Sequence, residues 1–330
     1  MDHILVTGGA GFIGSHLTDS LLADGHMVTV VDWEAEGIKK ENLTSHENLN
    51  VFHWDINALS PMTIFQKPID YVVHLAAQTS IVPSINKPVQ YYETNVTGTL
   101  KILELCRFSA IKKIIYAASS SCYGDRVGEE PITEDHPCSP QYPYALTKYL
   151  GEQLVQHWGH VYKLPWISLR LFNVYGPRAR ITNDYGAVFG TFLAQKLHNK
   201  PLTIVGDGLQ KRDFIHVKDV ISLIKKAMHS KISNGVFNVG SSDPKSIMDI
   251  VDLLGPITTV KLRKRPGEPN CTWADISKAY DIFKWTPQIK FESGVRDMLK
   301  NIEYWRNAPV WSRDSIACET DTWFKYLGDN

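Results

Sequence analysis

A glycine-rich turn near the start of the chain constrains the fold more than any other feature. The short apolar stretch His3–Thr7 is followed by Gly8, Gly11 and Gly14, and Phe12 and Ile13 open a run of apolar residues at helical spacing. Glycines here allow a tight turn, close approach to a pyrophosphate and close helix–strand packing, while the helix N-terminus attracts negative charge. The spacing is Gly-x-x-Gly-x-x-Gly, which differs from the usual Gly-x-Gly-x-x-Gly. The turn predicts a strand, a phosphate-binding loop and a helix.

An acidic residue at the end of the next apolar stretch indicates which dinucleotide would bind. Met27–Val31 is a second predicted strand, and Asp32 follows it directly. A carboxylate at this point can accept hydrogen bonds from the adenosine ribose and repels a 2′-phosphate. The two features together predict NAD as the cofactor, in preference to NADP.

Composition excludes several classes of protein. The chain has 330 residues, 43% of them hydrophobic, with 35 basic and 35 acidic side chains, so no nucleic-acid or anionic membrane partner is expected. No apolar run reaches the ~20 residues of a membrane helix, and no signal-peptide pattern precedes the first strand, so we expect a cytoplasmic protein. The five cysteines show no close pairing, which argues against a disulfide framework or a zinc site, and no metal is predicted.

Strands and helices alternate through the first half of the chain, which is typical of an α/β fold with a doubly wound parallel Rossmann sheet. The predicted strands are His3–Thr7, Met27–Val31, Asn50–Trp54, Tyr71–Leu75, Lys113–Ala118 and Trp166–Leu171. The predicted helices among the later strands are Pro61–Gln66, Pro88–Phe108 and Tyr144–His160.

The regular alternation stops near residue 175. We therefore expect residues 1–175 to form an NAD-binding Rossmann domain, and residues 176–330 to form mainly a smaller C-terminal α/β substrate lobe with an aromatic tail. Two strand-like segments near 213–240, Asp213–Val217 and Gly235–Val239, could return to the main sheet.

Tyr144 and Lys148 lie four residues apart in a predicted helix, so their side chains share one face. A neighbouring ammonium favours the phenolate, and Tyr144 could then act as a base near neutral pH. A tyrosine and a lysine at this spacing also occur on ordinary solvated helix faces. The predicted cofactor and the serines Ser119–Ser121, which follow a strand, favour the catalytic interpretation.

Several ordered motifs together resemble the extended short-chain dehydrogenase/reductases that act on nucleotide sugars, and most of all the UDP-sugar 4-epimerases. The resemblance covers about residues 1–305. Its motifs are Thr7–Gly14, Asp32, His74–Ala77, Asn95–Thr99, Ser119 with Tyr123 and Gly124, Tyr144-x-x-x-Lys148, Arg170–Pro177, Arg212–Val217 and Arg265–Glu268.

The resemblance implies roles for individual residues. Tyr144 would remove a proton from a sugar hydroxyl, Ser119 would hydrogen-bond the reacting oxygen, and Lys148 would lower the phenol pKa and hold the nicotinamide ribose. The implied cofactor-binding residues are Gly8, Gly11, Phe12, Ile13, Gly14, Asp32, Asp55, Ile56, Leu75, Ala76, Ala77, Asn95, Tyr144, Lys148 and Phe172. The implied substrate-binding residues are Ser119, Ser120, Ser121, Tyr144, Asn173, Arg212, Arg265, Glu268 and Thr272.

The residues after Ser119 separate the reaction types within the resemblance. Sugar 4,6-dehydratases usually carry an Asp-Glu pair there, and nucleotide-sugar decarboxylases commonly carry a Glu at the second position. This chain has Ser120 and Ser121, so elimination lacks its carboxylates. The implied outcome is C4 epimerisation of a UDP-sugar through a 4-keto intermediate, with NAD retained in each cycle.

The identity of the sugar stays open at this stage. In similar enzymes the residue before the Trp273-Ala274-Asp275 segment limits space around the C2 substituent, and the small Thr272 there would admit an N-acetyl group as well as a hydroxyl. A UDP-glucuronate 4-epimerase would use the same catalytic residues. Another nucleotide-sugar dehydratase, decarboxylase or reductase is an alternative. A non-catalytic nucleotide-binding protein is disfavoured, because Tyr144 and Lys148 are both present.

The resemblance also implies a homodimer, built through helices at Pro88–Phe108 and Tyr144–His160. The C-terminal segment from Trp305 falls largely outside the resemblance. We expect its aromatic side chains to pack a terminal helix onto the second lobe.

Overall fold

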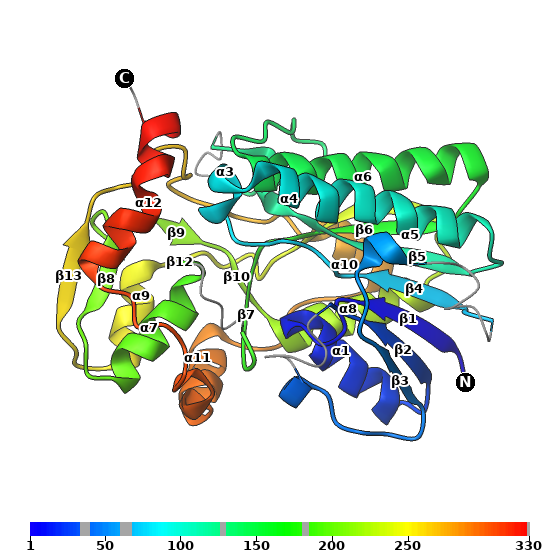
Figure 1. Ribbon diagram of the computed structural model, residues 1–330, viewed down its shortest axis with the longest axis horizontal. Coiled ribbons are helices and arrows are strands. Elements are labelled where there is room, and N and C mark those ends of the chain that lie inside the picture. Colours follow the sequence, from blue (N-terminus) through cyan, green and yellow to red (C-terminus); the bar gives the residue numbers. More distant parts are fainter. Residues whose placement is uncertain (34–39, 60–67, 126–129, 180–184, 329–330) are drawn as a thin grey trace.

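Seven strands form the central sheet of the computed structural model, which describes residues 1–33, 40–59, 68–125, 130–179 and 185–328 (Figure 1). All neighbouring strands in this sheet are parallel, in the order β11-β6-β5-β4-β1-β2-β3. Their bounds are β1 His3–Thr7, β2 Met27–Val31, β3 Leu49–Phe52, β4 Tyr71–His74, β5 Lys113–Ser119, β6 Trp166–Leu171 and β11 Asn234–Val239. The predicted α/β fold is confirmed.

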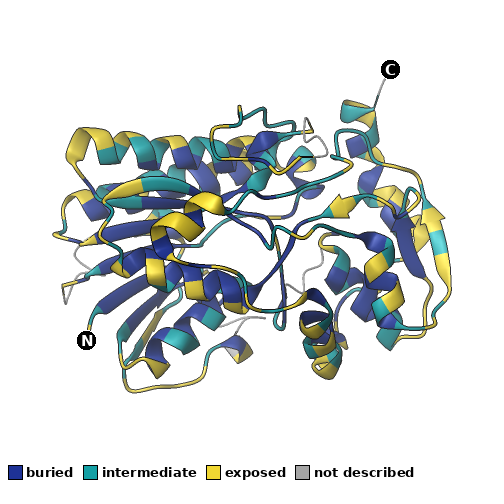
Figure 2. Ribbon diagram, turned by 180° about the vertical axis from the view of Figure 1, so that it is seen from behind, coloured by how far each residue is buried: buried dark blue, intermediate teal, exposed yellow. Residues whose placement is uncertain are grey.

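Helices cover both faces of the sheet. Helix α1 (Phe12–Ala23) packs against α8 (Val217–His229) on one face, and α5 (Gly98–Arg107) packs against α6 (Pro143–Tyr162) on the other (Figure 1). Alternate residues of β1 follow this division, because Ile4 and Val6 join the core under α1 and α8 while Leu5 joins the core under α5 and α6. The inner strands are accordingly buried along most of their length, whereas the edge strand β3 has no buried residue (Figure 2).

Several predicted segments differ from the structure by one or two residues at their ends, one predicted helix is divided, and one lies outside the described residues. The third strand is β3, which starts and ends earlier than predicted. The predicted helix Pro88–Phe108 is divided into α4 (Pro88–Tyr92), a π-helical turn, η3 (Glu93–Thr97), and α5. The predicted helix Pro61–Gln66 lies outside the described residues.

The two strand-like segments near 213–240 have different fates. Strand β11 joins the main sheet through β6. Strand β10 (Phe214–His216) does not join it, and instead pairs with β7 (Asn173–Tyr175) in a separate two-stranded sheet. In the main sheet β6 lies between β5 and β11, whereas β10 pairs with the strand that follows β6 in the chain.

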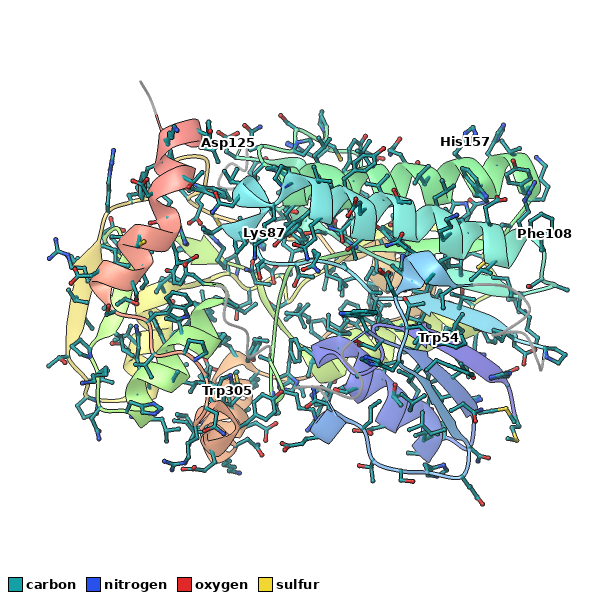
Figure 3. The ribbon with its side chains drawn as sticks, viewed as in Figure 1. Trp54, Lys87, Phe108, Asp125, His157 and Trp305 are labelled. Carbon is teal, nitrogen blue, oxygen red and sulfur yellow. The ribbon has the colours of Figure 1, made fainter. Side chains whose placement is uncertain are left out.

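The second lobe surrounds its own apolar core, which includes the buried side chains Phe189, Phe192, Phe214 and Trp305. Trp305 is labelled in Figure 3. The elements of this lobe are α7 Val188–Leu197, β8 Leu202–Val205, β9 Lys211–Arg212, β12 Lys245–Ser246, α9 Ile247–Leu254, β13 Thr259–Leu262 and α11 Phe291–Lys300. Three further helices are α3 Pro83–Asn86, α10 Ser277–Phe283 and α12 Arg313–Leu327. No helix among the described residues is long and apolar enough to cross a membrane.

Candidate active site

The glycine turn lies where the strand order reverses, between β1 and β4. Gly8 has φ +69°, and a Cβ at this position would lie 2.8 Å from the backbone nitrogen of Ala76, which follows β4. A Cβ on Gly14 would lie 2.1 Å from the carbonyl oxygen of Gly8. Gly11 caps α1 without a side chain. Gly8 and Gly14 leave no room for a side chain, and with Gly11 they form a cradle that fits the pyrophosphate of a dinucleotide at a helix N-terminus.

Asp32 is held against this turn at the end of β2. Its carboxylate accepts a hydrogen bond from the backbone nitrogen of Ala10 at 3.1 Å, and the side chain of Asn42 donates to the Ala10 carbonyl at 3.0 Å. The acid is 5% exposed. This geometry fixes the carboxylate beside the glycine turn. There it can accept hydrogen bonds from the adenosine ribose of NAD.

The end of β4 is tied to β1 by a buried histidine. His74 Nδ1 lies 2.6 Å from Thr7 Oγ1, and Nε2 lies 3.0 Å from Thr99 Oγ1. Burial, with a smaller contribution from the charge on Lys148, lowers the pKa of His74 to about 3. The neutral ring is thus structural. The predicted cofactor residues Leu75 and Ala76 follow it, and both donate backbone hydrogen bonds to Thr7.

Four further predicted cofactor residues lie elsewhere in the chain, two before β4 and two after it. Asn95 is 1% exposed, and its amide bonds both the nitrogen and the oxygen of Gln78 as well as Thr147 Oγ1, so it braces the loop after β4 against α6. Asp55 caps the short helix η2 (Ile56–Ala58), in which Ile56 is buried. Phe172 is buried in a small cluster behind Tyr123.

The serines expected at the reacting oxygen end β5 and begin the 3₁₀ turn η4 (Ser120–Tyr123). Ser119 Oγ lies 2.8 Å from Ser121 Oγ and accepts a hydrogen bond from the Ser121 backbone nitrogen at 3.2 Å. Helix α6 packs against both β5 and η4, so these hydroxyls and the start of α6 belong to one region.

Tyr144 and Lys148 occupy the first two turns of α6, where Pro143 is the first helical residue. Lys148 is 5% exposed, and its ammonium lies 4.5 Å from the centroid of the Tyr116 ring. Burial lowers the pKa of Lys148 to about 7, and the negative charge of Glu152 opposes that shift. Tyr144 is half-buried, with the ring of Tyr91 edge-on to it at 6.5 Å. The accessible phenol and the buried ammonium therefore share one face of the helix.

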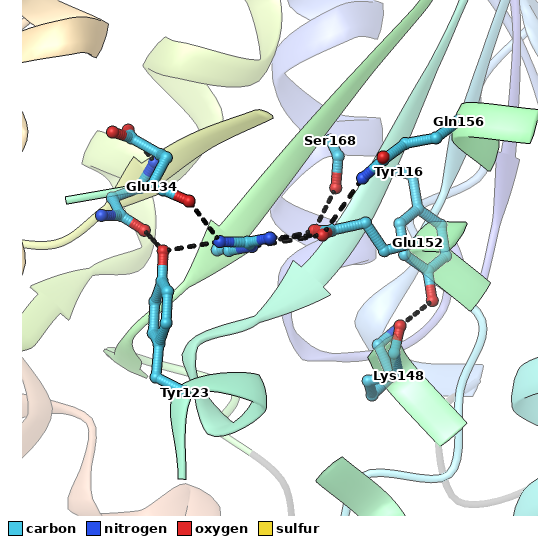
Figure 4. Close-up of polar contacts among 9 residues, drawn as sticks. Tyr116, Tyr123, Glu134, Lys148, Glu152, Gln156 and Ser168 are labelled. Carbon is cyan, nitrogen blue, oxygen red and sulfur yellow. Dashed lines mark hydrogen bonds and ion pairs between the residues drawn. The ribbon is translucent and has the colours of Figure 1, made fainter. Parts of the chain in front are cut away.

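A buried ion pair behind Lys148 was missed by sequence reasoning (Figure 4). Arg170 donates to Glu152 at 2.7 Å, and Ser168 Oγ donates to the same carboxylate at 2.9 Å. The guanidinium also bonds Tyr123 Oη at 2.9 Å and the carbonyl of Glu134 at 3.0 Å. One signal in the sequence could have found part of it, since Lys148 and Glu152 repeat the spacing of Tyr144 and Lys148.

The predicted substrate residues of the second lobe lie close to one another. Arg265 Nε lies 2.8 Å from Glu268, and Arg212 lies 3.7 Å from the same carboxylate. All three line a pocket of roughly 230 Å³. Thr272 Oγ1 lies 3.5 Å from Asn173 Oδ1, and the Thr272 backbone nitrogen donates to the carbonyl preceding Arg212. Two partly buried guanidinium groups that share one carboxylate leave net positive charge in the pocket, which suits a diphosphate.

One group of potential metal ligands occurs among the described residues, far from this site. Asp2, His26 and His229 lie at the amino ends of β1 and β2 and the end of α8. Asp2 already pairs with the ammonium of Lys112 at 2.8 Å. The group plays no part in the arrangement described above.

Comparisons with known proteins agree with the geometry. A sequence profile described as the NAD dependent epimerase/dehydratase family matches residues 4–240. A putative UDP-glucose 4-epimerase from Methanocaldococcus jannaschii is 33% identical, over 89% of this chain and 96% of the relative.

Two solved structures are similar over almost their whole length. One is a UDP-glucuronic acid 4-epimerase variant from Bacillus cereus, in complex with UDP-4-deoxy-4-fluoro-glucuronic acid and NAD. It has a TM-score of 0.85 and 35% identity, and covers 91% of this chain and 99% of its own. The other is a UDP-N-acetylglucosamine 4-epimerase from Methanobrevibacter ruminantium M1, in complex with UDP-N-acetylmuramic acid. It has a TM-score of 0.84 and 36% identity, and covers 91% of this chain and 97% of its own.

Proposed function

This chain belongs to the NAD dependent epimerase/dehydratase family, and from that membership we propose that it inverts C4 of a UDP-sugar through a transient 4-keto intermediate. The observation that carries the proposal is the combination of Tyr144 and Lys148 on α6 with three serines after β5. These residues provide a base and a hydroxyl for oxidation and reduction of a sugar carbon, without a carboxylate for elimination.

In the proposed reaction, side chains of the protein transfer the proton, and the cofactor would transfer the hydride. The glycine turn and Asp32 would hold NAD, which would supply a reversible hydride acceptor for C4. Tyr144 takes the proton of the C4 hydroxyl. It returns the proton after the keto sugar has rotated so that its opposite face is turned toward the cofactor site. Ser119 donates a hydrogen bond to the reacting oxygen. The ammonium of Lys148 stabilises the phenolate of Tyr144.

Elimination reactions are disfavoured by Ser120 and Ser121. Dehydration needs an acid at the leaving hydroxyl and a base at C5, and hydroxyl groups perform neither role well near neutral pH. The keto sugar is therefore expected to be reduced again rather than to lose water or carbon dioxide.

The pocket beside Arg212 and Arg265 is proposed to hold the diphosphate and uridine, with Glu268 on the uridine ribose. The small side chain of Thr272 supports acceptance of UDP-N-acetylhexosamines as well as UDP-hexoses. UDP-glucuronate is the second candidate substrate, because the Bacillus cereus UDP-glucuronic acid 4-epimerase has the same fold at 35% identity.

A homodimer is also proposed, built on α4, α5 and α6. Helices α4 and α6 and the residue after α5 expose large apolar side chains to solvent, at Val89, Tyr92, Phe108, Leu146, Val161 and Tyr162, each at least 42% exposed. Figure 3 labels Phe108 near the end of α5 and His157 on α6. Two copies that pair these helices in one bundle would bury such side chains.

A panel of UDP-sugars tests the proposed reaction. Purified protein with substoichiometric NAD should interconvert UDP-glucose with UDP-galactose, UDP-GlcNAc with UDP-GalNAc, or UDP-glucuronate with its C4 epimer. The products are distinguished by NMR of the sugar, and NADH is followed by absorbance. Release of NADH in proportion to product, or loss of water or carbon dioxide from the sugar, would refute an epimerase.

A further inference from the structure

The C-terminal helix α12 lies against both lobes. It begins with a capping box between Ser312 and Ser315 and buries one stripe of side chains, Ile316, Thr320 and Trp323. Ile316 and Trp323 form an apolar cluster with Val82, next to α3 of the first lobe, and with Tyr185. Helix α12 packs beside α3 in Figure 1, although the two are separated by more than two hundred residues.

Trp323 is the centre of this contact. Its side chain is 0% exposed, and its Nε1 donates a hydrogen bond to the carbonyl of Pro266 at 3.0 Å. Pro266 follows Arg265, whose guanidinium lies 2.8 Å from Glu268 and 5.4 Å from the ring of Tyr185. The indole is thus bonded to the loop that contains Arg265 and Glu268, the residues proposed to contact the diphosphate and the ribose.

The other side of the same indole meets the start of the catalytic helix. The ring centroids of Trp323 and Tyr142 are 5.3 Å apart. Tyr142 is the N-cap of α6 and lies two residues before Tyr144. Burial raises the pKa of Tyr142, so its phenol stays neutral beside the charges of Arg212, Arg265 and Glu268.

We infer that Trp323 is a positioning residue that couples the nucleotide-binding loop at Arg265 to the first turn of α6. One rigid aromatic ring contacts both segments, so a change in its shape alters the loop and the helix together. The inference rests on the proposed function, because it assigns the loop at Arg265 to the UDP moiety. It adds a residue from the part of the chain beyond residue 305, where the family resemblance ends.

Trp323→Phe tests the inference, because phenylalanine keeps an aromatic ring in the cluster but cannot bond to Pro266. UDP affinity of the NAD-loaded protein is measured by calorimetry, together with kcat for the UDP-sugar that is turned over and the melting temperature. We expect UDP to bind roughly 5-fold more weakly, as for the loss of one hydrogen bond, and kcat to fall as well. Tyr326→Ala, on the exposed side of α12, is the matched control and should change neither value.

The outcomes separate this inference from the proposed function. A Trp323→Phe protein that melts earlier but binds UDP and turns over like Tyr326→Ala has lost only stability, and the positioning role is then wrong. Weaker UDP binding in a protein that epimerises no sugar would support the inference and refute the proposed reaction. If Trp323→Phe does not fold, Tyr142→Leu removes the same ring contact from the other side, and unchanged UDP binding and kcat in that variant would overturn the inference.

Discussion

Glu152 and Arg170 form an ion pair that is almost completely withdrawn from water, with side chains 1% and 6% exposed and a closest approach of 2.7 Å. The carboxylate lies one helical turn beyond Lys148, and the guanidinium reaches Tyr123 at the end of the serine turn (Figure 4). The pair therefore connects the helix that carries the proposed base, Tyr144, with the loop that carries Ser119.

Neutralising this pair should destabilise the protein. Glu152→Gln leaves the Arg170 charge buried without its counter-ion, which costs about 3–5 kcal/mol in comparable pairs. Chemical denaturation would measure the loss of unfolding free energy. Glu303→Gln, which breaks the exposed pair with Arg306, is the control and should leave stability unchanged. Equal unfolding free energies for the two variants would show that the buried pair does not stabilise the fold.

The same pair predicts a pH effect on activity. Burial lowers the pKa of Lys148 to about 7, and the charge of Glu152 counteracts this. Turnover needs the ammonium form, so kcat should fall as pH rises through about 7. Because Glu152→Gln removes the opposing charge, it should lower the pKa of Lys148 further and move the fall to lower pH. The kcat–pH profiles of both proteins give the measurement, and a shift in the other direction contradicts this role of Glu152.

Tyr144→Phe removes the proposed base and keeps the ring. Epimerisation should fall by at least ~10²-fold, as expected for the loss of a general base, while bound NAD is retained. Tyr162→Phe, at the far end of the same helix, should turn over normally. Comparable activity in the two variants would show that another group accepts the proton.

Two glycine variants separate cofactor binding from backbone strain. Gly14→Ala places a Cβ 2.1 Å from the Gly8 carbonyl oxygen, so the turn must open and the purified protein should lose its NAD. Gly25→Ala meets no atom within 4 Å, although its φ is +80°, so it should cost about 1–2 kcal/mol and keep NAD. The cofactor released from each denatured protein is quantified by absorbance. Retention of NAD by Gly14→Ala would exclude the turn as its binding site.

The proposed dimer is tested by a charge on its helical face. Leu146→Glu places a carboxylate among the exposed apolar side chains of α4, α5 and α6, so the protein should become monomeric in light scattering coupled to size exclusion. Ile282→Glu, on the exposed side of α10, is the control and should keep the parent mass. A parent protein that is already monomeric would refute the dimer.

Local sequence patterns were sufficient to predict the sheet and the cofactor. Strands β1, β2 and β6 have the predicted bounds, because each is a short stretch rich in apolar side chains. The spacing of Gly8, Gly11 and Gly14 predicts the turn from local sequence alone, since the chain must turn tightly within these seven residues. The individual cofactor and substrate contacts stay predictions.

Long-range pairing could not be predicted in the same way. Nothing in Phe214–His216 itself distinguishes an eighth strand of the main sheet from the partner of β7, because the difference lies in pairing with a segment some forty residues away. Likewise, the partners of Arg170 come from positions 123, 134 and 152, and no local spacing joins all of them. The role of Asn95 as a brace depends on Thr147, fifty-two residues away.

The hydrogen bonds that fix Arg170 connect Glu152, Tyr123 and Glu134, whereas among the described residues the side chain of Thr272 bonds to Asp213 and Asn173 alone. Replacements at Thr272 should therefore leave the charge network behind the proposed base in place. With the proposed role of Thr272 beside the sugar, such a division would allow the preference for a sugar to diverge by mutation while the oxidation chemistry is inherited unchanged. It offers a physical reason why one ancestral frame could give rise to enzymes with different sugar substrates.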